Sequence, residues 1–200
     1  MTLYMPPHFR VDDRAALERF MDENGFATLV SHAAGGLSVS HVPLLVEAEG
    51  DALKLLGHVA RNNDHWRALE AADEVLAIFH GPHAYVSPTW YAQHPSVPTW
   101  NYAVVHAHGK ARLMDEAGLH DLVTRLSSKY EAGNAKPWRL SDQPAAYVSG
   151  MLQNIVGFEI EVQHLEGKFK LSQNRPAEIE RVIGALEKAG ETAVAALMKG

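Results

Sequence analysis

The side chains best suited to binding a ligand are most concentrated between residues 81 and 109. It holds five aromatic residues on a path stiffened by four prolines: Tyr85, Trp90, Tyr91, Trp100 and Tyr102, with Pro82, Pro88, Pro95 and Pro98. Aromatic rings bury large areas at low entropic cost, and the neighbouring amide of Asn101 can both donate and accept hydrogen bonds. Such a segment can wall a site for a flat heteroaromatic ligand. The alternative is a small satellite core beneath a long loop.

Two basic segments precede predicted helices, and each could hold an anion. Arg61 follows an apolar strand, and a helix is expected to begin just after it, near Asn63 or Asp64. An arginine beside free backbone N–H groups at a helix start makes a compact phosphate site. The second segment, residues 168–175, leads into the last predicted helix. In both cases a solvated basic loop is the alternative.

The chain has 12 histidines, which offer a further kind of chemistry. His106 and His108 are two residues apart and share one face of a predicted strand, so both imidazoles can reach one metal ion. No third metal ligand lies close to them in the sequence at a suitable spacing, and the candidates from elsewhere in the chain are His80, His83 and His94. We predict structural or interface histidines there and no metal site. His41 is either a core histidine or a hydrogen-bond donor to a bound ring.

Composition and missing motifs narrow the class of protein. The 200 residues are 46% hydrophobic, and 18 basic against 24 acidic residues give a net charge of −6. The absence of cysteine excludes disulfides, thiolate metal sites and a cysteine nucleophile. Dinucleotide-binding, P-loop, nucleophile-elbow and zincin motifs are absent, and the negative charge argues against a broad nucleic-acid surface. Without a membrane-length apolar stretch or an N-terminal signal core, we expect a cytoplasmic protein.

Hydrophobic patterns predict a mainly β protein with several helices. Strand patterns cover residues 26–31, 37–46, 53–60, 75–80, 84–87, 103–113 and 158–163. Helices are expected after Asp12 or Asp13 (closed by Gly25), after Asp115, after Ser141, and in the tail from about residue 176. Short turns join most of the strands, so the sheet should be largely antiparallel. An antiparallel barrel with packed helices, in a single domain, is the expected architecture.

Six motifs occur in a fixed order along the chain. They are Tyr-x-Pro-x-x-Phe at 4–9, His-x-Pro-Leu at 41–44, Gly-His-x-Ala-Arg-x-Asn at 57–63, two tryptophan motifs at 81–91 and 97–102, and Lys-Leu-Ser-Gln-Asn-Arg at 170–175. In these motifs the chain resembles the PaiB-type FMN-binding negative transcriptional regulators. The resemblance runs from residue 4 to residue 175 and leaves only the helical tail outside.

The resemblance implies a split β-barrel with flanking helices, similar to pyridoxamine-phosphate oxidase, that works as a homodimer with FMN between the subunits. It implies an FMN-binding domain at 1–175 and a helical tail at 176–200 packed on the same domain. The implied FMN contacts are His41, His58, Arg61, Asn62, Trp100, Asn101, Lys170, Gln173, Asn174 and Arg175. Among them, Arg61 and Asn62 would hold the phosphate, and residues 170–175 would come from the second subunit.

The implied function is a redox- or metabolite-linked regulator in which the flavin carries the chemistry. No residue stands out as a catalytic acid or base, so FMN-dependent oxidoreductase activity, as in a flavin reductase, remains an open alternative. Haem binding through His106, or through His164 before an expected turn at Glu166-Gly167, is another. Direct DNA binding is disfavoured, because the charge is negative and no helix-turn-helix with a basic face is found.

Overall fold

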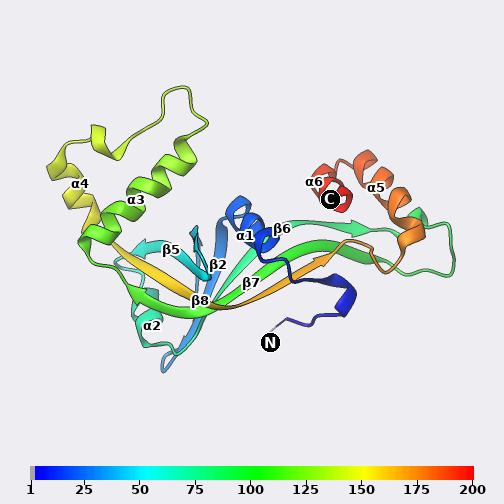
Figure 1. Ribbon diagram of the computed structural model, residues 1–200, viewed down its shortest axis with the longest axis horizontal. Coiled ribbons are helices and arrows are strands. Elements are labelled where there is room, and N and C mark those ends of the chain that lie inside the picture. Colours follow the sequence, from blue (N-terminus) through cyan, green and yellow to red (C-terminus); the bar gives the residue numbers. More distant parts are fainter. Residues whose placement is uncertain (1–2) are drawn as a thin grey trace.

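The computed structural model describes residues 3–200, and in them eight strands form one antiparallel sheet (Figure 1). The strands are β1 (Arg10–Val11), β2 (Phe26–Ala33), β3 (Gly36–Pro43), β4 (Leu45–Glu49), β5 (Ala52–Ala60), β6 (Val75–Val86), β7 (Thr99–Leu113) and β8 (Ile155–Lys170). The helices are α1 (Arg14–Glu23), α2 (His65–Ala71), α3 (Glu116–Glu131), α4 (Ala145–Leu152), α5 (Ile179–Lys188) and α6 (Thr192–Lys199). The predicted mainly β, antiparallel class with flanking helices is confirmed.

The strand order explains why the sheet curls into a barrel. The order is β3-β2-β6-β7-β8-β5-β4, so β3 and β4 are its two edges, yet only Leu44 separates them in the chain. The two edges must therefore meet at Leu44, which is fully buried and donates its N–H to the Gly25 carbonyl at 2.8 Å. β3 also contacts β5 across the curl. The result is an open, or split, barrel.

The main core fills the inside of this curl. β2, β6, β7 and β8 point alternate side chains inward, among them Leu29, Phe79, Val105 and Phe158, and α1 covers one opening. The contact between α1 and β8 is so close that a Cβ on Gly167 would lie 2.2 Å from Leu17 Cδ2. The expected turn at Glu166-Gly167 is therefore wrong. Gly167 lies inside β8, where its missing side chain admits the helix.

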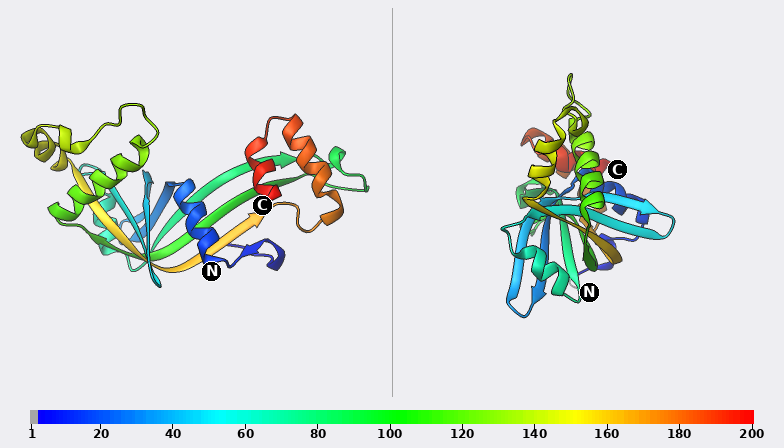
Figure 2. Two further views of the ribbon diagram at one scale, coloured as in Figure 1. Left: turned by 45° about the horizontal axis from the view of Figure 1, so that its top comes forward. Right: turned by 90° about the vertical axis from the view of Figure 1, so that its left-hand side faces the viewer.

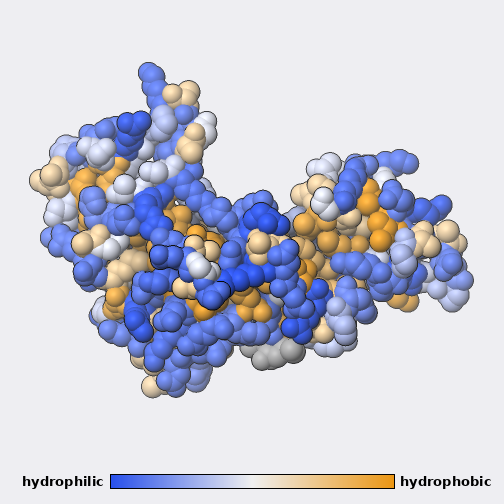
Figure 3. Space-filling view, viewed as in Figure 1, coloured by the Kyte–Doolittle hydropathy of each residue, from blue (hydrophilic) through white to orange (hydrophobic). Residues whose placement is uncertain are grey.

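Helices at the two ends of the molecule add separate apolar clusters. α3 and α4 pack on β5 and the start of β8 through Leu56, Leu122 and Leu152. At the other end β6, β7 and β8 extend as an arm that carries α5 and α6 (Figure 2). Hydrophobic residues gather where these two helices meet the arm (Figure 3). No helix within residues 3–200 is long and apolar enough to cross a membrane.

Several element boundaries differ from the sequence predictions. Asp13 is the N-cap of α1 and Gly25 directly follows its C-cap, Asn24, so both ends of this helix are as predicted. Ser141 lies in a short 3-10 turn, and α4 begins only after Pro144. The predicted strands at 75–80 and 84–87 are one strand, β6, interrupted by an irregularity between residues 80 and 83. The tail holds a second helix, α6, that the sequence did not predict.

Candidate functional site

The side of the sheet that faces away from the main core carries several aromatic and histidine side chains. Paired residues in antiparallel strands point to the same side of the sheet. One such row runs from Glu166 on β8 through His106, Ile78 and Thr28 to His41 on β3. We call this side of β2, β3, β6, β7 and β8 the outer face. Its exposed large apolar residues are Phe26, Leu37, Val39, Tyr85 and Trp100.

A shallow apolar pocket of about 480 Å³ lies on the outer face of the arm, where β6 and β7 pair. Its lining includes His80, His83, Trp100 and Tyr102. Trp100 is 53% exposed, and the edge of Tyr85 meets its ring at a centroid distance of 5.8 Å. The volume and the aromatic lining suit a flat ring system. The sequence signal for this pocket is the period-2 alternation of β7, which puts residues 100, 102, 104 and 106 on one side.

The end of β8 is held beside this pocket by Lys170. Its ammonium group donates to the Trp100 carbonyl at 2.6 Å and to the Thr99 hydroxyl. Burial lowers the pKa of Lys170, and the neighbouring Lys168 lowers it further. Trp100 and the segment 170–175 therefore lie together within one subunit. That residues 170–175 reach the site from the second subunit stays a prediction.

Asn101 points away from the pocket, because successive side chains of a strand alternate sides. It is fully buried, its amide NH₂ donates to Ser172 Oγ at 2.9 Å, and its Oδ1 accepts from that hydroxyl at 3.2 Å. Ser172 has φ of 68°, in the left-handed region, so the turn after β8 depends on this pair. Asn101 positions the turn, and within this subunit its amide does not reach the outer face.

The other predicted residues of this segment also hold the chain in place. Gln173 accepts the Leu171 N–H at 2.7 Å and donates to the Phe169 carbonyl at 2.6 Å. Arg175 donates to Ser96 Oγ at 3.1 Å, and its guanidinium lies 4.5 Å from the ring centroid of Tyr91. Asn174 is exposed on the surface of the same turn.

Glu178 is a buried carboxylate that fixes the loop after Tyr91, and sequence reasoning missed it. It accepts the backbone N–H groups of Ala92, at 3.1 and 3.0 Å, and of Gln93, at 3.1 Å. The pKa of Glu178 is lowered, chiefly by the hydrogen bond from the Ala92 N–H. Burial raises this pKa, whereas the Gln93 N–H and the charges of Arg181 and Arg175 lower it further.

We expect Glu178→Gln to lower the melting temperature at neutral pH by weakening this loop. Because the pKa of Glu178 is lower in the folded than in the unfolded protein, its ionised carboxylate stabilises the fold fully at pH values above the unfolded pKa, about 4.3. This stabilisation is lost as the pH falls through the folded pKa. The gap in melting temperature between the two proteins should therefore shrink below about pH 4.3. Glu180→Gln, at an exposed position on α5, is the control. A gap that stays constant on acidification would refute this role.

Arg61 lies at the opposite end of β8. Its Nε donates to the Gln153 carbonyl at 2.6 Å and its Nη2 to the Ile155 carbonyl at 3.0 Å. A guanidinium has five N–H donors, so exposed donors are left for an anion, and the exposed Asn62 lies beside it. The helix start does not contribute as expected. α2 has only seven residues, and Asn63 Oδ1 already accepts the His65 N–H at 3.1 Å.

His58 and His41 lie in different environments. His58 pairs with Gly157 on the side of β5 and β8 that α3 covers. Burial lowers the pKa of its imidazole, and its buried Nδ1 has no hydrogen-bond partner within residues 3–200. His41 is exposed on the outer face, with Nδ1 3.1 Å from the Thr28 hydroxyl. The structure therefore does not bring these two histidines to one point.

Apart from His41 on β3, the predicted site residues form two groups that lie toward opposite ends of β8. The Arg61 N–H donates to the Asn154 carbonyl just before β8, whereas Lys170 is its last residue. With 16 residues, β8 spans up to about 50 Å at roughly 3.3 Å per residue. An extended strand of this length is longer than one FMN molecule, and Arg61 and Lys170 lie at its opposite ends.

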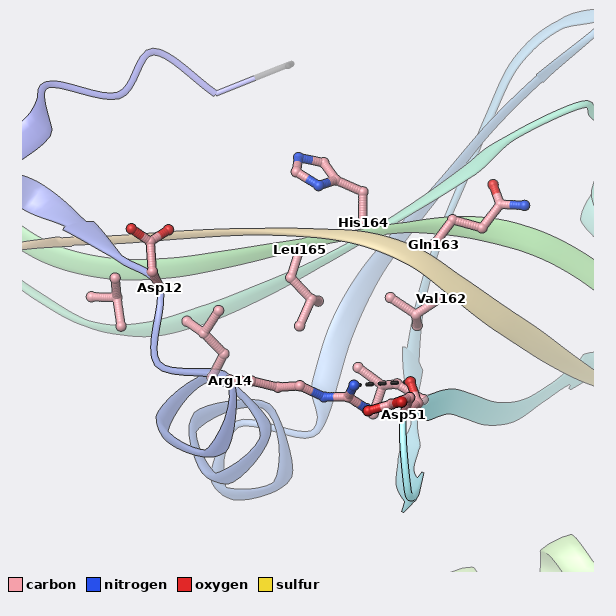
Figure 4. A pocket seen from close by; sticks show the side chains of 10 residues that line it. Asp12, Arg14, Asp51, Val162, Gln163, His164 and Leu165 are labelled. Carbon is pink, nitrogen blue, oxygen red and sulfur yellow. Dashed lines mark hydrogen bonds between the residues drawn. The ribbon is translucent and has the colours of Figure 1, made fainter.

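A further pocket, of about 280 Å³, lies between α1 and β8 (Figure 4). Arg14 is its main cation, and it donates to the carbonyls of Asp51 at 2.9 Å and Ala52 at 3.3 Å and to Glu18 at 2.6 Å. These bonds engage all three guanidinium nitrogens, and none of the predicted FMN contacts lines the pocket. It is therefore not our candidate site.

Solved structures share this fold, and two of them are similar over most of this chain. They are the "FAD and Heme binding protein from Mycobacterium smegmatis" (TM-score 0.62, 13% identity, 80% of this chain and 73% of that one) and the "Flavocytochrome Anf3 from Azotobacter vinelandii" (TM-score 0.63, 15% identity, 83% and 72%). At these identities the likeness concerns the fold.

Sequence comparisons identify the family of the chain, whereas the structural ones concern its fold. The model of a family described as "Putative FMN-binding domain" matches residues 3–164. "Protease synthase and sporulation protein PAI 2" of Bacillus subtilis is 37% identical over 173 residues, covering 86% of this chain and 83% of that protein. An uncharacterised protein of Emericella nidulans is 33% identical over 192 residues, covering 77% and 76%. The chain therefore belongs to this FMN-binding domain family, as its motifs predict.

Proposed function

We propose that this protein binds FMN in a site shared between two copies of the chain. Arg61 and Asn62 of one copy hold the phosphate, and the pocket around Trp100 of the other holds the ring. The observation that carries the proposal is the separation of the two predicted groups by the length of β8. Membership of an FMN-binding family supports one FMN site, and the residues that suit its phosphate and its ring lie toward opposite ends of β8.

The residues of both halves fit the chemistry of FMN. Arg61 has exposed guanidinium donors for a dianionic phosphate, and Asn62 adds an amide. The pocket is apolar and aromatic, with Trp100 and Tyr102 as walls and two histidines as polar groups at its margin. When bound, FMN supplies hydride or electron transfer. The chain binds and orients it, while Lys170 and Asn101 position the strand and turn beside the pocket.

The outer face is the surface we assign to the contact between the copies. It exposes several large apolar side chains, of which Leu37 is 72% and Phe26 67% exposed. Val39, two residues from Leu37 on the same strand face, is 56% exposed, and exposed apolar side chains of this size on one sheet face are typical of a protein interface. A twofold contact through this face is self-complementary, as in most homodimers.

Through the flavin, the protein would act as a redox- or metabolite-linked regulator of the PaiB type. A net charge of −6 favours indirect regulation over direct DNA contact. The haem alternative has less support, because His106 and His108 lie beside the Glu166 carboxylate and not in an apolar slot.

Titration of FMN, followed by quenching of its fluorescence, tests the proposal. The protein should bind about one FMN per chain, and Trp100→Ala should weaken binding roughly 10-fold, by the ~1.4 kcal/mol of one aromatic contact. Arg19→Ala, at an exposed position of α1, is a control that should bind as the wild type does. Absence of FMN binding by folded wild-type protein would refute the proposal.

A further inference from the structure

We propose that His106, His108 and Glu166 form a binding site for a divalent transition-metal ion, of which Zn²⁺ is the best fit, on the outer face. The site is separate from the FMN contacts and does not depend on them. His106 and His108 stand two residues apart on β7, and Glu166 is the register partner of His106 on β8.

The geometry of the three side chains suits a metal ion. One ligand atom from each lies within 4.8 Å of those of the other two. Tetrahedral Zn²⁺ with bonds near 2.0–2.1 Å holds its ligands about 3.3 Å apart, so modest rotations of the side chains complete the set. His108 and Glu166 are 6% and 5% exposed, which limits competition from water.

Glu74 completes an arrangement typical of metal-binding histidines. His108 Nε2 faces Glu166 Oε2 at 3.1 Å, while its Nδ1 lies 2.6 Å from Glu74 Oε1. A metal-bound imidazole usually donates its second N–H to a carboxylate, which fixes the tautomer and the ring orientation. Glu74 precedes β6, so it reaches His108 from a third strand. It is a positioning residue and not a ligand.

His164 is placed to supply a fourth ligand. Its register partner is His108, its ring centroid is 5.8 Å from that of His108, and its Nε2 is 4.0 Å from Glu166 Oε1. Figure 4 shows its side chain leaving β8 on the side opposite to Leu165, which faces inward. Three imidazoles and one carboxylate form a donor set that suits Zn²⁺ and other late first-row divalent ions, and not Mg²⁺ or Ca²⁺.

Calorimetric titration of the tag-free, metal-stripped full chain with Zn²⁺ tests this site. We expect one Zn²⁺ per chain in the wild type. His106→Ala and Glu166→Gln should each weaken binding by at least about 100-fold, beyond the usual range for outer-sphere changes, and Glu74→Gln by roughly 10-fold. Zn²⁺ should also raise the melting temperature of the wild type but not of Glu166→Gln. Co²⁺ should give the visible absorption of a four-coordinate site.

Two further measurements make the result decisive. His120→Ala, at an exposed position on α3, should bind Zn²⁺ like the wild type. Glu166→Gln keeps the shape of the side chain, so it reports on the site even if His106→Ala fails to fold. Wild-type protein that binds no Zn²⁺, or His106→Ala and Glu166→Gln variants that bind it with wild-type affinity, would overturn the proposal.

Discussion

Co-expression of chains carrying Arg61→Ala with chains carrying Trp100→Ala should restore tight FMN binding at about one quarter of the sites. Half of the randomly formed dimers contain one chain of each kind, and in such a dimer one of the two sites has both residues intact. Each variant alone should lack tight sites. Removing the guanidinium deletes charge-assisted hydrogen bonds worth about 1.5–3 kcal/mol, or roughly 10- to 150-fold in affinity. The restored fraction can be counted as bound FMN per chain after gel filtration.

The same experiment tests where the two halves of the site lie. If the phosphate were held within one chain, for example by Lys170 or Arg175 near Trp100, the mixture would show no tight sites beyond the average of the two variants. Arg61 also donates to the Gln153 and Ile155 carbonyls, so each variant is first checked for a wild-type melting curve. Arg61→Lys, which keeps the charge, should retain more affinity than Arg61→Ala.

Phe158→Ala should lower the free energy of unfolding by about 3–5 kcal/mol, a large part of the 5–15 kcal/mol typical of a folded domain. The ring is fully buried in the main core. It also packs directly against β5, since a Cβ on Gly57 would lie 2.8 Å from Phe158 Cζ. Removing the ring leaves a cavity at the point where β5 and β8 pair. Urea unfolding followed by circular dichroism measures the change.

The control for this experiment is Tyr147→Ala, which truncates an aromatic side chain that is 58% exposed on α4. It should change the unfolding free energy by no more than about 0.5 kcal/mol. A loss below about 1 kcal/mol for Phe158→Ala would mean that the barrel core does not depend on this ring. Because Arg61 and Asn154 lie beside β5 and β8, Phe158→Ala should weaken FMN binding as well.

Local patterns predicted those features that a few neighbouring residues determine. The carboxylate of Asp13 caps α1 because it needs only the next turn of the chain, and period-2 alternation identified the strand with His106 and His108. Boundaries failed where distant packing decides them. Glu166-Gly167 has the composition of a turn, but pairing with β7 and β1 keeps it extended, and the absent side chain makes room for Leu17.

The sequence by itself determined the family, the antiparallel class and the kinds of side chain available for a flavin. Only the tertiary structure decided how those side chains are grouped. It separated Arg61 from Trp100 by the length of β8, turned Asn101 inward, and brought Glu166 to His106 from 60 positions along the chain. The physical reason is that side-chain identity and spacing are local, whereas strand register and the curl of the sheet arise from pairing between distant segments.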